Sequence, residues 1–544
     1  MAYYGRDPTV SVTTMTDTNS YSEDDKELVA MGYVPSFKRE FSNLATISFA
    51  FSIMGLCSSI ATTFNTPLLT GGPASVVWCW GLGACMCLTL GSSIAEIVSA
   101  YPTSGGLYTA SARLTPKKYR ARVGWLVGWL NILGQIAGVS STEFGLANMI
   151  WAAVVIGKDG NYEVTQAKTV WLFVVLLIVH GSLNCLGTRM LARMSSSFVF
   201  VNLGATILII IVLLATTPRS EMHAAGYVFG SQGLVNQTGG WNNGLAFVFG
   251  LLSVQWTMTD YDATAHICEE VKRAAYAAPS AIFIAVIGTG VLGWLLNIVL
   301  VLCSGPLADL PGASDSAFLQ IMFLRMGKAG CLILWVFVCF TAFFVVQTAL
   351  QAVSRTVYAF SRDHGLPDGG YFGYNSKITQ TPLRAIVLCT VVSIGPGLLD
   401  LASPIAATAI FALCAISLDL SYIIPIFLRR VFQNHPEVMF KPGPFYMGDG
   451  ILGWAANVNC IIWTLFVCVI FSFPTTLPVT PQTMNYASVI TVGVMVLAFA
   501  WYIVDGHRHY HGPQSNLHQL KEREEEEEKA AELGISSEDH KEPV

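Results

Sequence analysis

The chain has 544 residues, of which 53% are hydrophobic and only 12% are charged, with a formal net charge of −5 at pH 7 and a mean hydropathy of +0.54. The charged fraction is about half that of an average soluble protein. This composition excludes an ordinary soluble protein and indicates a polytopic membrane protein, for which we expect no nucleic-acid partner.

The N-terminal 40 residues are polar, and no short apolar segment followed by a small-residue cleavage site occurs in them. We therefore expect a cytosolic tail over 1–40 rather than a cleavable signal peptide. Beyond it, charge-free runs such as Thr169 to Gly187 are each long enough to cross a hydrocarbon core about 30 Å thick. They predict an all-α membrane protein with about twelve transmembrane helices, near 43–66, 75–98, 123–150, 169–188, 194–217, 244–271, 277–303, 329–358, 383–402, 404–428, 448–474 and 484–504.

The basic residues of the loops set the expected orientation. Eighteen Lys and Arg residues lie in the loops on one side of the predicted spans, and five lie on the other side. Because cytoplasmic loops carry the excess of Lys and Arg, both termini are expected in the cytosol, which requires an even number of spans. The last segment, 506–544, is predicted to be a cytosolic tail with an acidic run at Glu524 to Glu528.

The sixth predicted span carries polar residues near the middle of the bilayer. The apolar run from Leu245 to Trp256 reaches roughly 18 Å at 1.5 Å per residue, a little past the centre of the hydrocarbon core. Acidic residues follow it, and they are expensive in hydrocarbon, so they mark a site. A helix that breaks there exposes backbone groups that a bound solute or a water-filled cavity can satisfy. Such broken helices are typical of secondary transporters.

Six polar signatures are spread along the chain from about Asp25 to Tyr510. They are Leu28 to Ser42, Phe51 to Gly55, Ala95 to Tyr108, Tyr261 to Glu270, Ser354 to Pro367, and Phe473-Pro474 with Pro478 to Thr480 and Met484 to Tyr486. In this order they resemble the amino acid-polyamine-organocation transporters, and most closely the fungal amino acid, GABA and choline permease branch. Each signature is weak alone, whereas six in register are strong.

The resemblance implies a LeuT-type fold, in which two groups of five spans are related by a pseudo-two-fold axis in the membrane plane and two C-terminal helices follow. It implies a first repeat over 41–217 (spans 1 to 5), a second repeat over 241–430 (spans 6 to 10), and spans 11 and 12 over 448–504. Phe51 to Leu56 lies about 12 to 20 Å into span 1. Gly55 is therefore the expected counterpart of the break after Trp256.

The resemblance also implies that substrate binds where the two interrupted helices face each other. In span 1 the expected contacts are Ser52, Ile53, Met54, Gly55 and Leu56, where amides at a half-helix N-terminus would hold a carboxylate. The alternative is an ordinary glycine in a tightly packed membrane helix. In span 6 the expected contacts are Trp256, Thr257, Met258, Thr259, Asp260 and Tyr261. Family members often carry glycine near this point.

Asp260 bears most directly on the substrate class. Its carboxylate can pair with a substrate ammonium, while the ring of Trp256 or Tyr261 can stack a cation for roughly 0.5 to 2 kcal/mol. The alternative is that Asp260 points to water or caps the following helix, a role that Asp suits well.

Three further acids are candidates for coupling and gating. For Asp262 and Glu270 we expect gating, or packing against an inner-face basic residue such as Arg355. Asp419 lies roughly 15 Å deep in span 10, where a carboxylic acid can exchange protons or form structural hydrogen bonds. The resemblance implies proton coupling, although span 5 carries Asn202 where proton-coupled relatives can carry a basic residue.

Together these features predict a secondary transporter, or permease, that moves an amino acid or a GABA-like amine by alternating access coupled to protons, in the plasma membrane rather than the vacuolar membrane. We expect the partners to be a small-molecule substrate, membrane lipid and a proton. No cofactor, metal site or enzymatic activity is expected, because no paired-histidine motif or nucleophile elbow occurs. The alternatives are a permease for choline, another organic cation or a polyamine, and a membrane nutrient sensor that binds without transporting.

Overall fold

The computed structural model describes residues 22–376, 378–401, 404–438, 440–481 and 483–513. They fall into two units. In the first unit, Met1–Ser36 with Pro513–Val544, the described part contains helix α1 (Glu23–Ala30), whose first turn is capped by the side chain of Ser22. The second unit is Phe37–Gly512. The acidic run Glu524 to Glu528 and most of the predicted tails lie outside the described residues.

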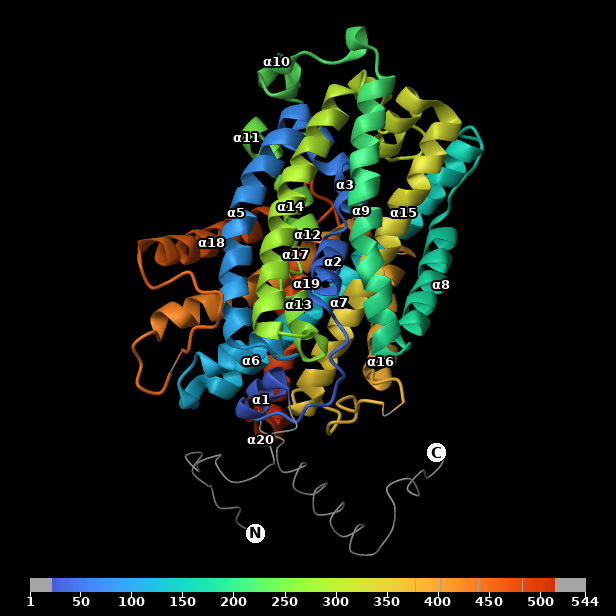
Figure 1. The fold of residues 1–544 in the computed structure, drawn as a ribbon. Helices are drawn as coiled ribbons and strands as arrows, with labels where there is room; N and C mark the ends of the chain where they lie inside the picture. The colour runs from blue at the N-terminus through green and yellow to red at the C-terminus, as the bar shows by residue number, and fades with distance from the viewer. Residues whose placement is uncertain (1–21, 377, 402–403, 439, 482, 514–544) are drawn as a thin grey trace, which may run out of the picture. The chain divides into compact units, whose positions relative to one another are not determined.

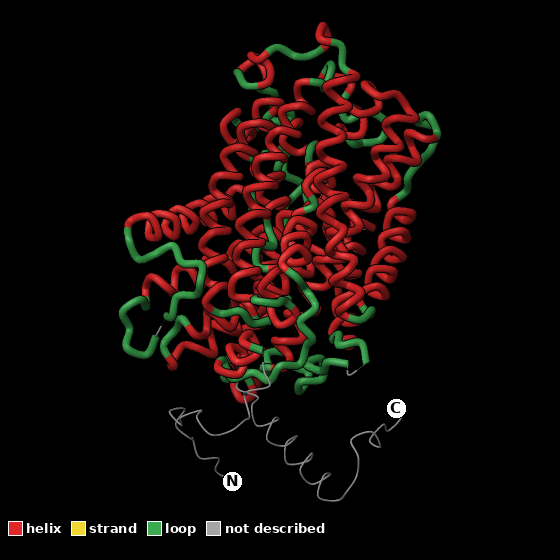
Figure 2. The backbone as a smooth tube through the Cα atoms, viewed as in Figure 1, coloured by secondary structure: helices red, strands yellow, loops and turns green. Residues whose placement is uncertain are grey.

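The second unit is a bundle of α-helices (Figure 1), of which ten are long and apolar enough to cross a membrane. They are the segment formed by α2 (Asn43–Met54), α3 (Leu56–Thr63) and α4 (Asn65–Thr70), then α5 (Gly72–Ala100), α7 (Lys117–Gly157), α8 (Gln166–Asn184), α9 (Thr188–Thr216), α14 (Ala274–Leu302), α15 (Ala317–Arg362), α17 (Pro404–Val431), α18 (Ile451–Ile470) and α19 (Ala487–Trp501). Within the described ranges the backbone is helix and loop (Figure 2), apart from one isolated bridge between Phe41 and Val271. The predicted all-α membrane fold is confirmed.

The two remaining predicted spans are shorter. The sixth is interrupted and consists of α11 (Asn243–Val248), α12 (Leu251–Met258) and α13 (Ala263–His266), followed by the 3₁₀ turn η4 (Cys268–Glu270). The ninth is α16 (Leu383–Leu398), which has 16 residues. Neither meets the length expected of an uninterrupted transmembrane helix, so a search by helix length alone would miss both spans.

Helix α15 is longer than the span predicted at 329–358 because it joins two helices. Gly327 has φ 69° and ψ 176°, which is not helical. The stretch before Gly327 is therefore a separate helical segment, and the predicted span corresponds to the part that follows the kink. A left-handed φ costs glycine nothing, so glycine suits this joint.

The helix pairs follow the expected pseudo-symmetry. Helix α5 packs along α14, α7 packs along α15, and α8 packs along α16. These are spans 2 and 7, 3 and 8, and 4 and 9, which a pseudo-two-fold axis would make equivalent. Helix α7 also packs along α17, and α2 packs along α9. The exact repeat boundaries stay a prediction.

The two ends of the bundle differ in charge. Helix α6 (Gly106–Arg113), the start of α7 and the end of α15 lie at one end, which carries Arg113, Arg122 and Arg362 and is called the basic end below. Helix α10 (Ala225–Val228) lies at the opposite end (Figure 1).

Candidate functional site

The first break lies at Gly55, between α2 and α3. Gly55 has φ 49° and ψ 51°, and a Cβ atom there would overlap the side chain of Val345. Both the left-handed backbone and the close contact therefore require glycine. As at any helix N-terminus, the first amides of α3 lack intrahelical acceptors and carry the positive end of the helix dipole. The Phe51 carbonyl beside the break accepts a hydrogen bond from Asn202 Nδ2 at 3.0 Å.

The second break lies at Thr259 and Asp260, between α12 and α13. Thr259 is extended, with φ −68° and ψ 178°, and Asp260 is left-handed, with φ 63°. Asp and Asn enter this region more readily than most residues. The Asp260 backbone N–H donates to Tyr422 Oη at 3.0 Å, which ties the break to α17.

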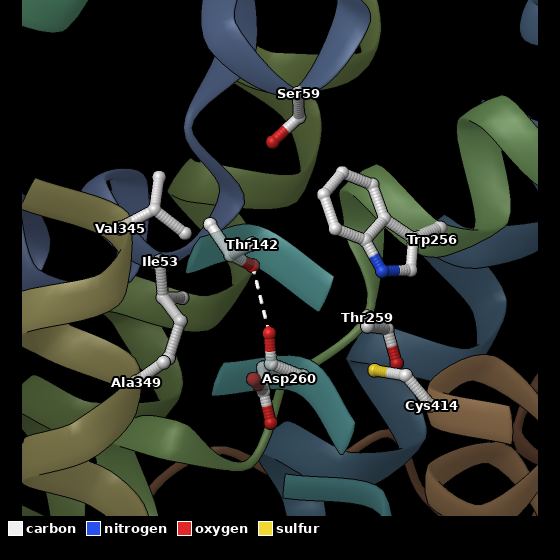
Figure 3. Close-up of a pocket in the computed structure, with 10 residues that line it drawn as sticks. Ile53, Ser59, Thr142, Trp256, Thr259, Asp260, Val345, Ala349 and Cys414 are labelled. Atoms are coloured by element: carbon white, nitrogen blue, oxygen red, sulfur yellow. Dashed lines mark hydrogen bonds between the residues drawn. The ribbon is translucent and has the colours of Figure 1, made fainter. Parts of the chain in front are cut away.

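A small cavity lies between the breaks (Figure 3). It has room for about one water molecule, so a solute can enter only when the walls move apart. Helices α2, α3, α7, α12, α15 and α17 and the loop after α12 contribute to the wall, so both halves of the chain form it. The lining residues are Ile53, Ser59, Gly138, Thr142, Trp256, Thr259, Asp260, Val345, Ala349 and Cys414.

The Asp260 carboxyl group has no partner within the described part of the chain. The residue is 7% exposed, its Oδ1 forms no hydrogen bond, and Oδ2 lies against Gly138 of α7. The side chain does not cap α13, whose N-cap position is Asp262. Neither the water-facing alternative nor the capping alternative describes it. An isolated buried carboxylate is costly unless a cation joins it, so the cavity suits a cationic group.

Four of the eleven predicted substrate contacts line this cavity, namely Ile53, Trp256, Thr259 and Asp260. The other seven, whose role stays a prediction, are Ser52, Met54, Gly55, Leu56, Thr257, Met258 and Tyr261. Tyr261 points elsewhere, because its ring packs edge-on against Tyr422 at 5.7 Å. The Thr257 hydroxyl donates to the Ser253 carbonyl at 2.7 Å.

Sequence reasoning missed six lining residues: Ser59, Gly138, Thr142, Val345, Ala349 and Cys414. Gly138 and Thr142 are four apart on α7, and Val345 and Ala349 are four apart on α15, so each pair shares one helix face. The four-residue spacing within each pair is visible in the sequence. Nothing in a helix that is apolar all round tells which face turns toward a cavity.

Asp262, two residues after Asp260, lies in a hydrogen-bonded cluster next to the second break. Its Oδ1 accepts from Tyr422 Oη at 2.9 Å, and its Oδ2 accepts from Asn131 Nδ2 at 2.7 Å. His266 Nε2 lies 2.9 Å from the same Oδ2, and His266 Nδ1 lies 3.1 Å from the Ser104 carbonyl oxygen. Tyr422 therefore links the backbone of Asp260 to the carboxylate of Asp262.

Two buried ion pairs lie at the basic end next to this cluster. Glu270 Oε1 lies 2.6 Å from Arg355 Nε, and neither side chain is exposed. The expected contact between Glu270 and Arg355 is therefore present. Glu269 accepts from Arg362 at 3.3 Å and from the Ser104 backbone N–H at 3.1 Å. Glu269 is buried.

Asp419 lies in a separate cluster between α12 and α17. Its Oδ2 accepts from Gln255 Nε2 at 2.8 Å, and its Oδ1 is buried without a partner. Gln255 Oε1 in turn accepts from Trp463 Nε1 at 3.1 Å. The side chain of Gln255 on α12 therefore connects the interrupted helix to Asp419.

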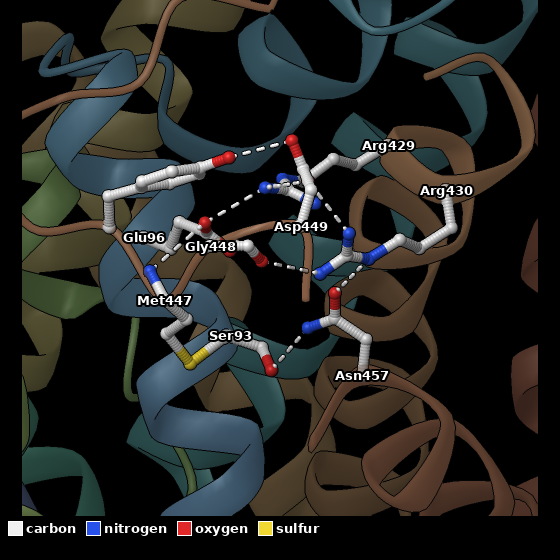
Figure 4. A network of polar contacts seen from close by, with 9 residues as sticks. Ser93, Glu96, Arg429, Arg430, Met447, Gly448, Asp449 and Asn457 are labelled. Atoms are coloured by element: carbon white, nitrogen blue, oxygen red, sulfur yellow. Dashed lines mark hydrogen bonds and ion pairs between the residues drawn. The ribbon is translucent and has the colours of Figure 1, made fainter. Parts of the chain in front are cut away.

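A polar network joins α5, α17 and the loop before α18 (Figure 4). Arg429 donates to Glu96 Oε1 at 2.9 Å and to Asp449 Oδ1 at 3.1 Å, and Arg430 donates to the same Asp449 oxygen at 2.9 Å. Partial burial works against ionisation of Asp449, but the hydrogen bond from Tyr446 and the two arginine charges hold the pKa of its carboxyl below the ordinary value. Among the described residues, no group of three His, Cys, Asp or Glu is placed to hold a metal ion.

Comparison with known proteins gives matches over nearly the whole chain. Residues 41–496 match the family model described as amino acid permease. The chain is 42% identical over 510 residues to an uncharacterized amino-acid permease of Schizosaccharomyces pombe, covering 92% of each chain. It is 37% identical to amino-acid permease 2 of Neurospora crassa, covering 91% of this chain and 90% of that one. It is 35% identical to the GABA-specific permease of Saccharomyces cerevisiae, covering 91% and 87%.

One solved structure supports the fold. A crystal structure of a variant of the Eremococcus coleocola manganese transporter aligns with a TM-score of 0.51 at 13% identity, covering 90% of this chain and 97% of that one. At this identity the likeness concerns the fold alone.

Proposed function

Since this chain belongs to the amino acid permease family and is an amino acid transporter of the multi-pass membrane type, we propose that it carries an amino acid or a GABA-like amine by alternating access in symport with protons. The observation that carries the proposal is the Asp260 carboxyl group, buried without a partner at the wall of the cavity between the two helix breaks. A substrate ammonium supplies the missing counter-charge.

We place the substrate carboxylate at the start of α3. Ser59, in the first turn of α3, lines the cavity, and Figure 3 shows it on the other side of the view from Asp260. The amides that begin α3 favour an anion through their free N–H groups and the helix dipole. In a form whose walls have moved apart, a zwitterion with charges separated along a short chain would meet the α3 amides at one end and Asp260 at the other.

Choline is the second candidate, because Asp260 and the ring of Trp256 both line the cavity. A ring face can stack a quaternary ammonium group. Tyr261, the second aromatic residue that such a cage needs, does not line the cavity. Choline would also leave the α3 amides without an anion, so we place it after the zwitterion.

Transport by this proposal requires that the basic end open. Spans 1, 2, 6 and 7 would rock as a unit against spans 3 to 5 and 8 to 10. The ion pair of Glu270 with Arg355 connects span 6 to span 8, so it would break on opening and act as a gate. Asp419 would carry the coupling proton, because it contacts span 6 through Gln255.

We further propose that the protein acts in the plasma membrane with both termini in the cytosol. The orientation is supported by the eighteen basic residues of the loops at the basic end against five opposite. Cysteine introduced at Lys118 should then react with an impermeant reagent only in permeabilised cells, and cysteine at Lys158 should react in intact cells. Reaction at position 118 in intact cells reverses the orientation.

Uptake of a labelled amino acid and amine panel by proteoliposomes, with and without a pH gradient, tests the function. We expect concentrative uptake of a carboxylate-bearing amine when the outside is acidic. Uptake of choline alone would make the second candidate correct, and binding without uptake of any compound would indicate a sensor.

A further inference from the structure

The contacts of His266 fix how many protons it shares with Asp262. A backbone carbonyl only accepts hydrogen bonds, so His266 Nδ1 must carry a hydrogen toward the Ser104 oxygen 3.1 Å away. His266 Nε2 and Asp262 Oδ2 are 2.9 Å apart, and one proton must lie between them. Whether that proton resides on nitrogen or on oxygen, the pair holds one more proton than a neutral imidazole beside a carboxylate.

We propose that His266 is a positioning residue that closes the basic end only while this additional proton is present, so that opening releases a proton. The inference rests on the proposed transport function and assigns part of its proton dependence to a residue that faces no substrate. Imidazole is the side chain that gains and loses a proton near neutral pH.

The partners of the pair belong to elements that would separate on opening. Asp262 and His266 lie at and next to α13, which is span 6, whereas Asn131 lies on α7 and Tyr422 lies on α17. Ser104 precedes α6, which packs mainly on α7. Each hydrogen bond from the pair to these three residues therefore bridges the moving spans and the fixed spans. All five side chains or backbone groups are buried.

The additional proton makes this burial possible. With it, His266 donates to Ser104 and to Asp262, and the pair has no net charge. Without it, a nitrogen lone pair would face a carboxylate oxygen, and a net negative charge would be buried in a site that also contains Asp260. Such burial is costly. Because opening releases the proton in this proposal, opening is favoured as the pH rises and closure as it falls.

Charged side chains near this cluster have partners of their own. Helices α2 and α14 carry no charged residue, and α6 carries Arg113 at its last position. Arg39 donates to the Cys268 and Val271 carbonyl oxygens, Arg355 pairs with Glu270, Arg362 pairs with Glu269, and Asp363 accepts from Tyr108. Asp419, on α17, contacts Gln255.

The closed cluster also acts on the substrate site. Tyr422 donates to Asp262 Oδ1 and accepts from the backbone N–H of Asp260. Loss of the proton at His266 would therefore loosen Asp262, then Tyr422, and finally the left-handed residue whose carboxylate lines the cavity. His266 acts on the substrate only through these two residues.

The chain provides a matched control in His180. His180 Nδ1 lies 2.9 Å from Glu143 Oε2 with both side chains fully buried, and His180 Nε2 lies 3.1 Å from the Phe343 carbonyl oxygen. This pair also lies between a carboxylate and a backbone carbonyl, with the two ring nitrogens exchanged, but α7, α8 and α15 all belong to the fixed spans. Removing it tests the loss of a buried histidine without touching the gate.

Cys268 reports opening of the basic end without any transport assay. It is fully buried in η4 between the cluster and the Glu269 pair. The experiment measures its alkylation by N-ethylmaleimide in the purified full-length protein, by peptide mass spectrometry, between about pH 6.5 and about pH 8.5, that is, from the ordinary imidazole value upward. Each rate is divided by that of Cys85, which is exposed, to cancel the effect of pH on thiol reactivity.

We expect the normalised rate in the native protein to rise several-fold, and at most about tenfold, per pH unit, the limit for an opening linked to one proton. His266→Gln should react quickly at every pH, whereas His180→Gln should keep the native profile. A flat native profile overturns the proposal even if His266→Gln does not fold, and so does a native profile in His266→Gln. Substrate exchange by the same preparations decides the transport function separately, since its absence would leave the alkylation result standing.

Discussion

Replacing Asp260 with Asn removes the charge from the cavity and leaves the local backbone intact. Asn adopts the left-handed region as readily as Asp does, and the Asp260 backbone N–H that bonds Tyr422 is unaffected. The side chain has nearly the same volume, so the cavity keeps its shape. No ion pair within the described residues is broken, because the Oδ1 of Asp260 has no partner. The variant should therefore be at least as stable to heat as the native protein.

The expected loss concerns affinity. A hydrogen bond to a charged group contributes about 1.5 to 3 kcal/mol, so Asp260→Asn should weaken binding of a GABA-like amine roughly 10- to 150-fold. Isothermal titration of the detergent-solubilised protein measures this, with a carboxylate lacking the amine as a second ligand whose weak binding should not change. Glu143→Gln is the matched control, since Glu143 is a buried carboxyl group outside the cavity and the change should leave the affinity unchanged. Equal affinity of Asp260→Asn and native protein for every amine would refute the assignment.

Four further outcomes follow from the contacts. Gly55→Val should abolish uptake in a protein that remains folded and correctly located, because a left-handed valine next to Val345 is strained; normal kinetics would remove Gly55 from the site. Asp419→Asn should lose pH-driven accumulation in proteoliposomes and retain exchange, whereas retained accumulation would make Asp419 structural. Glu270→Gln should destabilise the closed form by about 3 to 5 kcal/mol, since it leaves Arg355 buried without a counter-charge, and adding Arg355→Gln should recover part of the thermal stability; additive losses would argue against the pair. Because the pKa of Asp449 is lowered, its ionised carboxylate contributes to the free energy of unfolding above the ordinary carboxyl value of about 3.9, and this contribution disappears as the pH falls through the lowered value. The melting temperature of Asp449→Asn should therefore approach that of the native protein in strong acid. A difference that stays constant with pH would contradict this.

The fold was largely predictable because local sequence features, namely apolar runs and single residues that interrupt them, determine where its helices begin and end. Uninterrupted apolar runs give the long spans, and Gly327 marks the joint that begins the predicted eighth span. The resemblance of six signatures to the amino acid permeases is confirmed by the match over residues 41–496. The interruption after Trp256 could be anticipated from Asp260 and Asp262, since two acids do not continue a helix through hydrocarbon without a purpose.

The sequence predicted the cavity-lining residues at the two helix breaks but not those on the helices that face the breaks. Thr142 and Val345 belong to helices that are buried on most faces, so the sequence pattern does not show which face lines the cavity. Tyr261 illustrates the converse, because it follows Asp260 directly yet packs against Tyr422. The left-handed conformation of Asp260 turns neighbouring side chains in directions that helical spacing cannot give.

The backbone of residue 260 also restricts how this transporter can diversify. A φ of 63° is readily adopted by Gly, Asn and Asp and resisted by branched or bulky side chains. Asp codons are one nucleotide from an Asn codon and one nucleotide from a Gly codon, so a duplicated copy can pass from an anionic wall to a neutral polar wall, or to no side chain, in one mutational step without rebuilding the loop. Paralogues that share this break are therefore expected to separate into discrete ligand classes according to which of the three residues they carry here.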